Sequence, residues 1–164
     1  MRQEQLTADS FSPDTVDLLK ALHEHGVRYL IVGGEAVIYY GYARVTGDID
    51  FFYESSAENV RRLFDALRQF WGGDVPGVAE AGEFLQAGLI VQFGVPPNRI
   101  DLVNRIDGVA FAAAWPNRLA VTVTVPGFEI PVWFVGKDDL IANKRAAARP
   151  KDLDDLRFLT RETR

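Results

Sequence analysis

Apolar and polar residues alternate along this chain with two different periods, which predict helices and strands in turn. From Val60 to Phe70 the apolar side chains recur every three or four positions, which is the spacing of an amphipathic helix over residues 57–70. By contrast, residues 27–32 (VRYLIV) and 48–53 (DIDFFY) are short runs rich in β-branched and aromatic side chains, typical of buried strands. The chain therefore combines both kinds of element.

The same criteria, together with a helix-start pattern at residues 12–14 and a stop at Gly26, predict the remaining elements. We expect helices over residues 13–25, 35–40, 137–148 and 150–160, and strands over residues 89–93, 99–103, 119–125 and 129–134. Strands and helices mix without a strict strand–helix–strand repeat, so we predict an α+β (mixed α/β) fold, with a mixed β-sheet flanked by helices. We expect a single domain over residues 1–164, with a flexible start over residues 1–11 and a two-helix C-terminal segment over residues 137–164.

Composition restricts the chemistry that this chain can perform. Its 164 residues include no cysteine, which excludes disulfides, thiolate zinc sites and a cysteine nucleophile. Its two histidines, His23 and His25, stand two apart in a predicted helix, where their side chains point in different directions and do not easily share a metal. Carboxylates, and metals that prefer oxygen ligands, are left to carry most of any reaction.

Charge and hydropathy indicate a cellular setting rather than a function. The formal net charge of -5 does not favour binding to nucleic acid by bulk attraction, although a local basic patch is compatible with it. No stretch approaches the length of apolar sequence that a membrane helix needs, and residues 1–10 lack the apolar core of a signal peptide. We therefore predict a cytoplasmic protein without a membrane segment.

The most distinctive local pattern is Asp48-Ile49-Asp50 within a predicted strand. Residues two apart face the same side of a strand, so both carboxylates project together while Ile49 turns to the core. Two carboxylates this close repel each other unless a cation lies between them, and Mg²⁺ is a natural partner. The alternative interpretation is a strand whose polar face carries two aspartates with no metal, as isolated Asp-x-Asp pairs commonly do.

Two further patterns strengthen the metal-site interpretation. Gly33-Gly34 follows a predicted buried strand and precedes a short helix, where glycine amides can approach phosphate oxygens. Asp101 lies among apolar residues in another predicted strand and provides a third carboxylate. Taken singly, the glycines are explained by loop geometry and Asp101 by an edge position, but together they favour a site that handles phosphate. Glu35 either joins this acidic group or lies on an exposed turn.

The combined pattern resembles the nucleotidyltransferase superfamily with the polymerase-β-like fold, in which a strand, Gly-Gly or Gly-Ser, Asp-x-Asp and a later acid follow one another. In this chain the corresponding segments are Val32-Gly33-Gly34, Asp48-Ile49-Asp50 and Ile100-Asp101-Leu102. Within the superfamily, the chain is most similar to minimal bacterial members of the toxin–antitoxin and abortive-infection (AbiEii-like) type. The segments that carry this second similarity are Gly33-Gly34-Glu35-Ala36, Arg44-Val45-Thr46 and Lys144…Arg149-Pro150-Lys151-Asp152.

The resemblance implies a Mg²⁺-dependent enzyme that transfers a nucleoside monophosphate from an NTP to a hydroxyl group. Asp48, Asp50 and Asp101 would be the catalytic residues and would hold one or two Mg²⁺ ions, with Asp101 a candidate base. The implied nucleotide- and phosphate-binding residues are Gly33, Gly34, Arg44, Thr46, Lys144, Arg149 and Asp152. The implied acceptor is a tRNA 3′ end or a protein, and a toxin role would imply an antitoxin partner.

Several of these residues also have simpler interpretations. Lys144 shares the apolar face of its helix, and either extends its stem outward to solvent or directs its cation at phosphates. Arg149 either binds phosphate or lies at a helix junction, and Asp152 either joins the site or complements a helix dipole. Arg44 either reaches a phosphate or pairs with the acids. For the whole protein, the alternative function is a non-catalytic nucleotide-binding or partner module that retains the fold.

Overall fold

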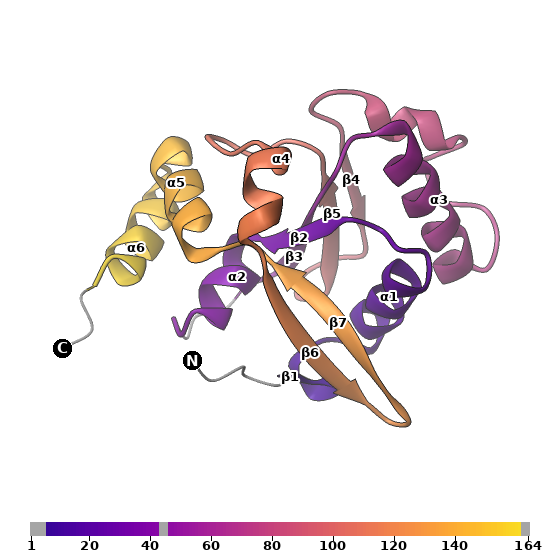
Figure 1. The fold of residues 1–164 in the computed structure, drawn as a ribbon, viewed down its shortest axis with the longest axis horizontal. Helices are drawn as coiled ribbons and strands as arrows, with labels where there is room; N and C mark the ends of the chain where they lie inside the picture. The colour runs from indigo at the N-terminus through magenta and orange to yellow at the C-terminus, as the bar shows by residue number, and fades with distance from the viewer. Residues whose placement is uncertain (1–5, 43–45, 162–164) are drawn as a thin grey trace.

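The computed structural model describes residues 6–42 and 46–161. Within these residues, seven strands form one mixed sheet with helices packed around it (Figure 1). The strands, in chain order, are β1 (Leu6–Thr7), β2 (Tyr29–Val32), β3 (Asp48–Tyr53), β4 (Ile90–Phe93), β5 (Arg99–Val103), β6 (Leu119–Val125) and β7 (Phe128–Phe134). Their order in the sheet is β1-β6-β7-β2-β3-β5-β4. The mixed α/β fold class predicted from the sequence is confirmed.

Six α-helices accompany the sheet in the described part of the chain. They are α1 (Pro13–Glu24), α2 (Gly33–Tyr39), α3 (Ala57–Trp71), α4 (Phe111–Ala114), α5 (Lys137–Ala147) and α6 (Pro150–Leu159). Short 3-10 segments cover Ala8–Ser10, Ala81–Leu85 and Trp115–Asn117. Helices α1 and α3 pack together at one end of the molecule, and α5 and α6 form a pair at the other (Figure 1). No helix among the described residues is long and apolar enough to cross a membrane.

Strand β3 lies near the middle of the sheet, antiparallel to β2 and parallel to β5. Its residues Ile49 and Phe51 are buried in the core, whereas Asp48 and Asp50 are only partly buried. This alternation follows from the two-residue period of a strand, and it is the arrangement that the sequence predicts. The packing of β3 therefore directs two carboxylates to one face.

The hydrophobic core fixes the strands that carry those carboxylates. Leu18 of α1 and Leu67 of α3 are fully buried, and each such side chain contributes about 1.5–3 kcal/mol to folding. The rings of Tyr29 on β2 and Phe51 on β3 pack edge to face, with centroids 5.4 Å apart. The polar side of β3 is thus supported by a well-packed apolar side.

Two details differ from the elements that the sequence predicts. Gly33 and Gly34 were expected to precede a helix, but they form its first turn, with Gly33 at a φ of +68° that glycine adopts without steric cost. The second detail is β1, whose residues Leu6 and Thr7 pair with β6 inside the segment expected to be flexible. A strand of two residues is too short for its alternation to be recognised in a sequence.

Candidate active site

Three aspartates meet where β3 and β5 lie side by side. The two strands run parallel with Asp50 in register with Asp101, and Asp48 lies two residues before Asp50 on the same face. One carboxylate oxygen from each of the three residues lies within 4.8 Å of the others. The fold thus brings together the three acids that the sequence singles out.

Gly33 packs directly against this group of carboxylates. A Cβ atom at this position would overlap Oδ2 of Asp50, and the left-handed backbone conformation also disfavours any other residue. Gly34, in contrast, is buried within α2. Glycine at position 33 therefore allows the first turn of α2 to approach the acids closely.

Arg99, which the sequence reasoning did not select, forms ion pairs with two of the three acids. Its Nη2 donates to Oδ2 of Asp48 at 2.7 Å, and its Nε donates to Oδ1 of Asp101 at 3.1 Å. Arg99 is in register with Asp48 and lies two residues before Asp101 on β5. The two-residue period that relates Asp48 to Asp50 is therefore the signal that could have identified it.

Burial and mutual repulsion make it costly to ionise all three carboxylates. Burial, followed by the charges of Asp48 and Asp101, raises the pKa of Asp50 to about 7. Burial also raises the pKa of Asp101, although its hydrogen bonds with Arg99 and Asp50 oppose that rise. The interaction with Asp101 therefore favours the protonated form of Asp50. Such a group is strongly stabilised by a bound cation.

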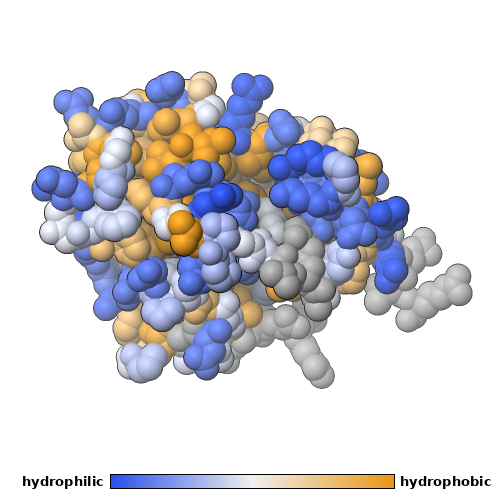
Figure 2. Space-filling model, turned by 180° about the vertical axis from the view of Figure 1, so that it is seen from behind, coloured by the Kyte–Doolittle hydropathy of each residue, from blue (hydrophilic) through white to orange (hydrophobic). Residues whose placement is uncertain are grey.

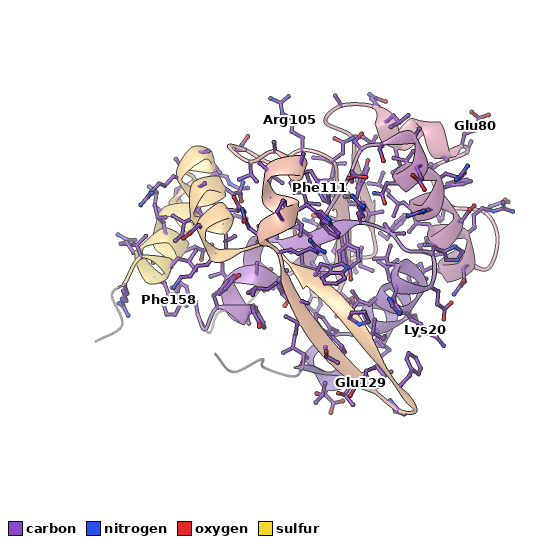
Figure 3. All side chains as sticks on the ribbon, in the orientation of Figure 1. Lys20, Glu80, Arg105, Phe111, Glu129 and Phe158 are labelled. Carbon is purple, nitrogen blue, oxygen red and sulfur yellow. The ribbon has the colours of Figure 1, made fainter. Side chains whose placement is uncertain are left out.

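A cavity of about 350 Å³ opens beside Asp50, and we call it the Asp50 cavity. Besides Asp50 and Gly33, its charged and polar lining comes from Arg105, Asp107, Asn143, Lys144 and Arg149. Arg105 extends from the loop that follows β5, at the edge of the molecule (Figure 3). Three of the lining residues are cationic and two are acidic, and of the cations Lys144 and Arg149 are already paired with Asp152.

A second cavity, of about 310 Å³, opens beside Asp48 and shares no lining residue with the first. We call it the Asp48 cavity. Arg99 contributes to its wall together with the acid Glu35, and hydroxyl groups are provided by Ser10, Ser12 and Thr15. The three carboxylates thus adjoin two cavities, of which the one next to Asp50 has the more cationic lining and the one next to Asp48 the more acidic lining.

The side chain of Lys144, on α5, packs against α6. It does not extend outward to solvent, as its exposed fraction of 3% shows. Its Nζ lies 3.0 Å from Oδ1 of Asp152 and 3.0 Å from Oδ2 of Asp155, both on α6. Asp152 also accepts hydrogen bonds from the backbone N–H and the Nε of Arg149, at the start of α6. These contacts hold α6 against α5 at an end of the molecule whose surface is largely hydrophilic (Figure 2).

The remaining residues named from the sequence lie close to Asp48 or outside the described chain. The hydroxyl of Thr46 donates to the backbone oxygen of Asp48 at 3.1 Å and lies 3.2 Å from its Oδ1. Thr46 therefore orients the start of β3 and the carboxylate of Asp48. Arg44 lies outside the described residues.

The three aspartates form a donor set that fits a divalent cation such as Mg²⁺. Their oxygens lie within 4.8 Å of one another, and two oxygens that ligate one ion at about 2.0–2.6 Å lie at most about 5 Å apart. Carboxylate oxygens are also the ligands that Mg²⁺ prefers. The residues that could hold the metal are therefore Asp48, Asp50 and Asp101.

Comparison with known proteins identifies the family to which this site belongs. No curated protein matches the chain. A family model described as a nucleotidyltransferase of unknown function (DUF6036) matches residues 14–159, a range that includes all three acids, Gly33 and Arg99. The match supports the nucleotidyltransferase superfamily that the sequence motifs indicated. The chain therefore belongs to the DUF6036 family of nucleotidyltransferases.

Proposed function

We propose that the protein is a Mg²⁺-dependent enzyme that transfers a nucleoside monophosphate from an NTP to a hydroxyl group and releases pyrophosphate. The observation that carries this proposal is the convergence of Asp48, Asp50 and Asp101 beside two cavities of different charge. Nucleotidyl transfer needs a metal site, a cationic site for the triphosphate and a separate approach for the acceptor. The described chain offers a candidate for each.

The three aspartates would hold one or two Mg²⁺ ions. When bound, the metal neutralises charge on the reacting phosphate and increases the acidity of the attacking hydroxyl. Asp101 is the candidate base, since its carboxylate lies within the group that would hold the metal. Thr46 supports this arrangement by fixing the carboxylate of Asp48.

The triphosphate would occupy the Asp50 cavity. Arg105 and Arg149 supply positive charge there, and Gly33 leaves space for phosphate oxygens to approach the backbone at the start of α2. Because the cation of Lys144 is engaged by two acids, its main part in this proposal is to hold α6, and with it Arg149, at the wall of the cavity. Gly34 and Arg44 complete the proposed phosphate-binding set.

The acceptor would approach through the Asp48 cavity. An in-line displacement places the attacking and leaving oxygens on opposite sides of the phosphorus, so a second opening beside the same acids is required. Following the resemblance to toxin–antitoxin and abortive-infection enzymes, we propose a tRNA 3′ end or a protein as acceptor. In that setting the protein is a cytoplasmic toxin-type component with an antitoxin partner.

The direct test is transfer of label from an NTP. The full-length protein is incubated with each α-labelled NTP in turn, with Mg²⁺, and with total tRNA or a cell extract as the source of acceptor. We expect labelled tRNA or labelled protein together with released pyrophosphate. Asp48→Asn should abolish both, whereas Asp65→Asn, which removes an exposed carboxylate on α3, should leave both unchanged.

The two other outcomes have distinct meanings. Nucleotide binding without transfer to any acceptor would contradict the catalytic proposal and identify a nucleotide-binding module. If neither binding nor transfer occurs at millimolar Mg²⁺ and NTP, the function proposed for the three acids is wrong.

A further inference from the structure

The guanidinium of Arg99 lies against the carboxylates that are the candidate metal ligands. We propose that Arg99 is an internal counter-ion of the metal site, which a divalent cation displaces from Asp48 and Asp101, and which Glu35 then receives in the Asp48 cavity. This inference rests on the metal site of the proposed function. It adds that Arg99 changes its ion-pair partner when the metal binds, and that this change controls how tightly the metal binds.

The contacts of Arg99 use the oxygen atoms that a metal would need. The guanidinium bonds Oδ2 of Asp48, and it reaches both carboxylate oxygens of Asp101, at 3.1 and 3.2 Å. The other oxygen of Asp48 lies beside the hydroxyl of Thr46. A divalent ion therefore competes with Arg99 for the same lone pairs, and the two positive charges also repel each other at this distance.

Arg99 can leave these contacts because its side chain is 31% exposed and lies in the wall of the Asp48 cavity. Asp101, whose side chain is only 9% exposed, cannot follow it without disturbing the core. A long, partly solvated side chain changes rotamer at small cost, whereas the carboxylates are fixed by the pairing of β3 with β5. The movable partner of each ion pair is therefore the arginine.

Glu35 offers the displaced guanidinium a new partner. Glu35 lies in the first turn of α2 and lines the same cavity as Arg99. Among the described residues its carboxylate forms no hydrogen bond or ion pair, and burial together with the charge of Asp48 disfavours its ionised form. A half-buried carboxylate without a partner is stabilised when a cation arrives. Metal binding to the aspartates would supply that cation by releasing Arg99.

Metal binding without nucleotide tests the displacement. Binding of Mn²⁺ to the full-length protein is followed by electron paramagnetic resonance, and binding of Mg²⁺ by calorimetry. Removing a partly exposed competing ion pair should strengthen metal binding, so we expect Arg99→Met to lower the Kd for Mn²⁺ by about three- to tenfold. The matched control is Lys151→Met, because Lys151 acts on Asp50 only through its charge. Its effect should be less than about twofold.

A double-mutant cycle tests the part assigned to Glu35. Glu35→Gln should raise the Kd for Mn²⁺ in the wild-type background, because the displaced Arg99 then lacks its new partner. In the Arg99→Met background the same substitution should have no effect. An equal effect of Glu35→Gln in both backgrounds would show that Glu35 acts on the metal directly, and would overturn the exchange.

The remaining outcomes separate this inference from the proposed function. If Mn²⁺ binds the wild type, and Arg99→Met leaves its affinity unchanged or weakens it, Arg99 is not a competitor and the inference is wrong while the metal site stands. If no variant binds Mn²⁺ at millimolar concentration, both the inference and the proposed metal site are wrong. Circular dichroism of each variant establishes that it is folded.

Discussion

Two clusters of aspartates and cations in the described part of the chain differ chiefly in burial. The site cluster joins Asp48 and Asp101 to Arg99, and the side chains of its Asp48–Arg99 pair are 25% and 31% exposed. The helix cluster joins Asp152 of α6 to Lys144 of α5, whose side chains are 0% and 3% exposed. In the first cluster the partly exposed Arg99 pairs with two acids, and the third acid, Asp50, lies beside them. In the second, the charges are enclosed between two helices.

The difference indicates which charges are available to a ligand. Removing one partner of a buried ion pair strongly destabilises the folded protein, so the helix cluster is suited to holding α5 and α6 together. The site cluster keeps three carboxylates beside two cavities and has more negative than positive charge. The repulsion among its carboxylates is relieved when a divalent cation supplies positive charge.

The largest expected effect is on activity at the site cluster. Asp50→Asn keeps the shape of the side chain and removes one charge of the proposed metal site, so the proposed transfer activity should fall by about a thousandfold. The free energy of unfolding of the Asp50→Asn variant should stay the same or rise, because the substitution removes one of three carboxylates that repel one another. Rates of pyrophosphate release and urea unfolding curves measure the two effects. A variant with full activity would contradict the assignment of Asp50.

The helix cluster should respond in the opposite way, through stability. Lys144→Met removes the buried cation that contacts both Asp152 and Asp155, while Arg149 still pairs with Asp152, and the loss should cost about 3 kcal/mol in the free energy of unfolding. Adding Asp152→Asn and Asp155→Leu to Lys144→Met should recover most of that loss of stability. Urea unfolding measures both variants. A loss below about 1 kcal/mol would show that the cluster behaves as an ordinary surface pair.

The pH dependence of stability should come from the site cluster. The pKa of Asp50 is raised to about 7 in the folded protein, above its ordinary value of 3.8, so the folded state binds more protons between these values. Stability should therefore fall as pH rises from about 4 to 7, by on the order of 3 kcal/mol. Thermal unfolding measured across this range should show the slope. Both Asp50→Asn and saturating Mg²⁺ should reduce it.

The smallest effect is expected from the glycine that touches the site. Gly33→Ala adds a Cβ at a positive φ, and that atom also overlaps Asp50. The matched control is Gly77→Ala, which has a φ of +77° but no atom within 4 Å of the added Cβ. Both should lose about 1 kcal/mol of stability to backbone strain, and Gly33→Ala should in addition lose some stability and metal affinity because Asp50 must move away from the added Cβ. Equal metal affinities in the two variants would show that the contact with Asp50 is unimportant.

Most of the fold could be predicted from local patterns. Strand bounds at residues 48–53, 99–103 and 119–125 agree with the structure, because each run alternates or is uniformly apolar over a full strand. The two C-terminal helices also agree closely with their predicted ranges. The order of strands in the sheet could not be predicted, because it depends on which strands pair across long stretches of sequence.

The site was predictable to the extent that its residues share local patterns. Asp48, Asp50 and Gly33 stand out in short motifs, whereas the partners of each charge do not. Whether Lys144 faces a phosphate or an aspartate depends on how α5 packs on α6, and no spacing within one helix determines that. Arg99 was missed because an arginine on a strand commonly lies at the surface, and its contact with Asp48 depends on the register of β3 with β5.

That parallel register has a consequence for how the protein matures. Asp48 and Arg99 are 51 residues apart in sequence and meet only after β3, α3 and β5 have been synthesised and docked. Contacts of this separation form late, since closing a long loop is entropically costly and is repaid only by the completed sheet. In a partly synthesised or locally unfolded chain the aspartates of the proposed metal site are therefore apart from one another. The proposed metal site therefore forms only when the strands that carry it have folded together.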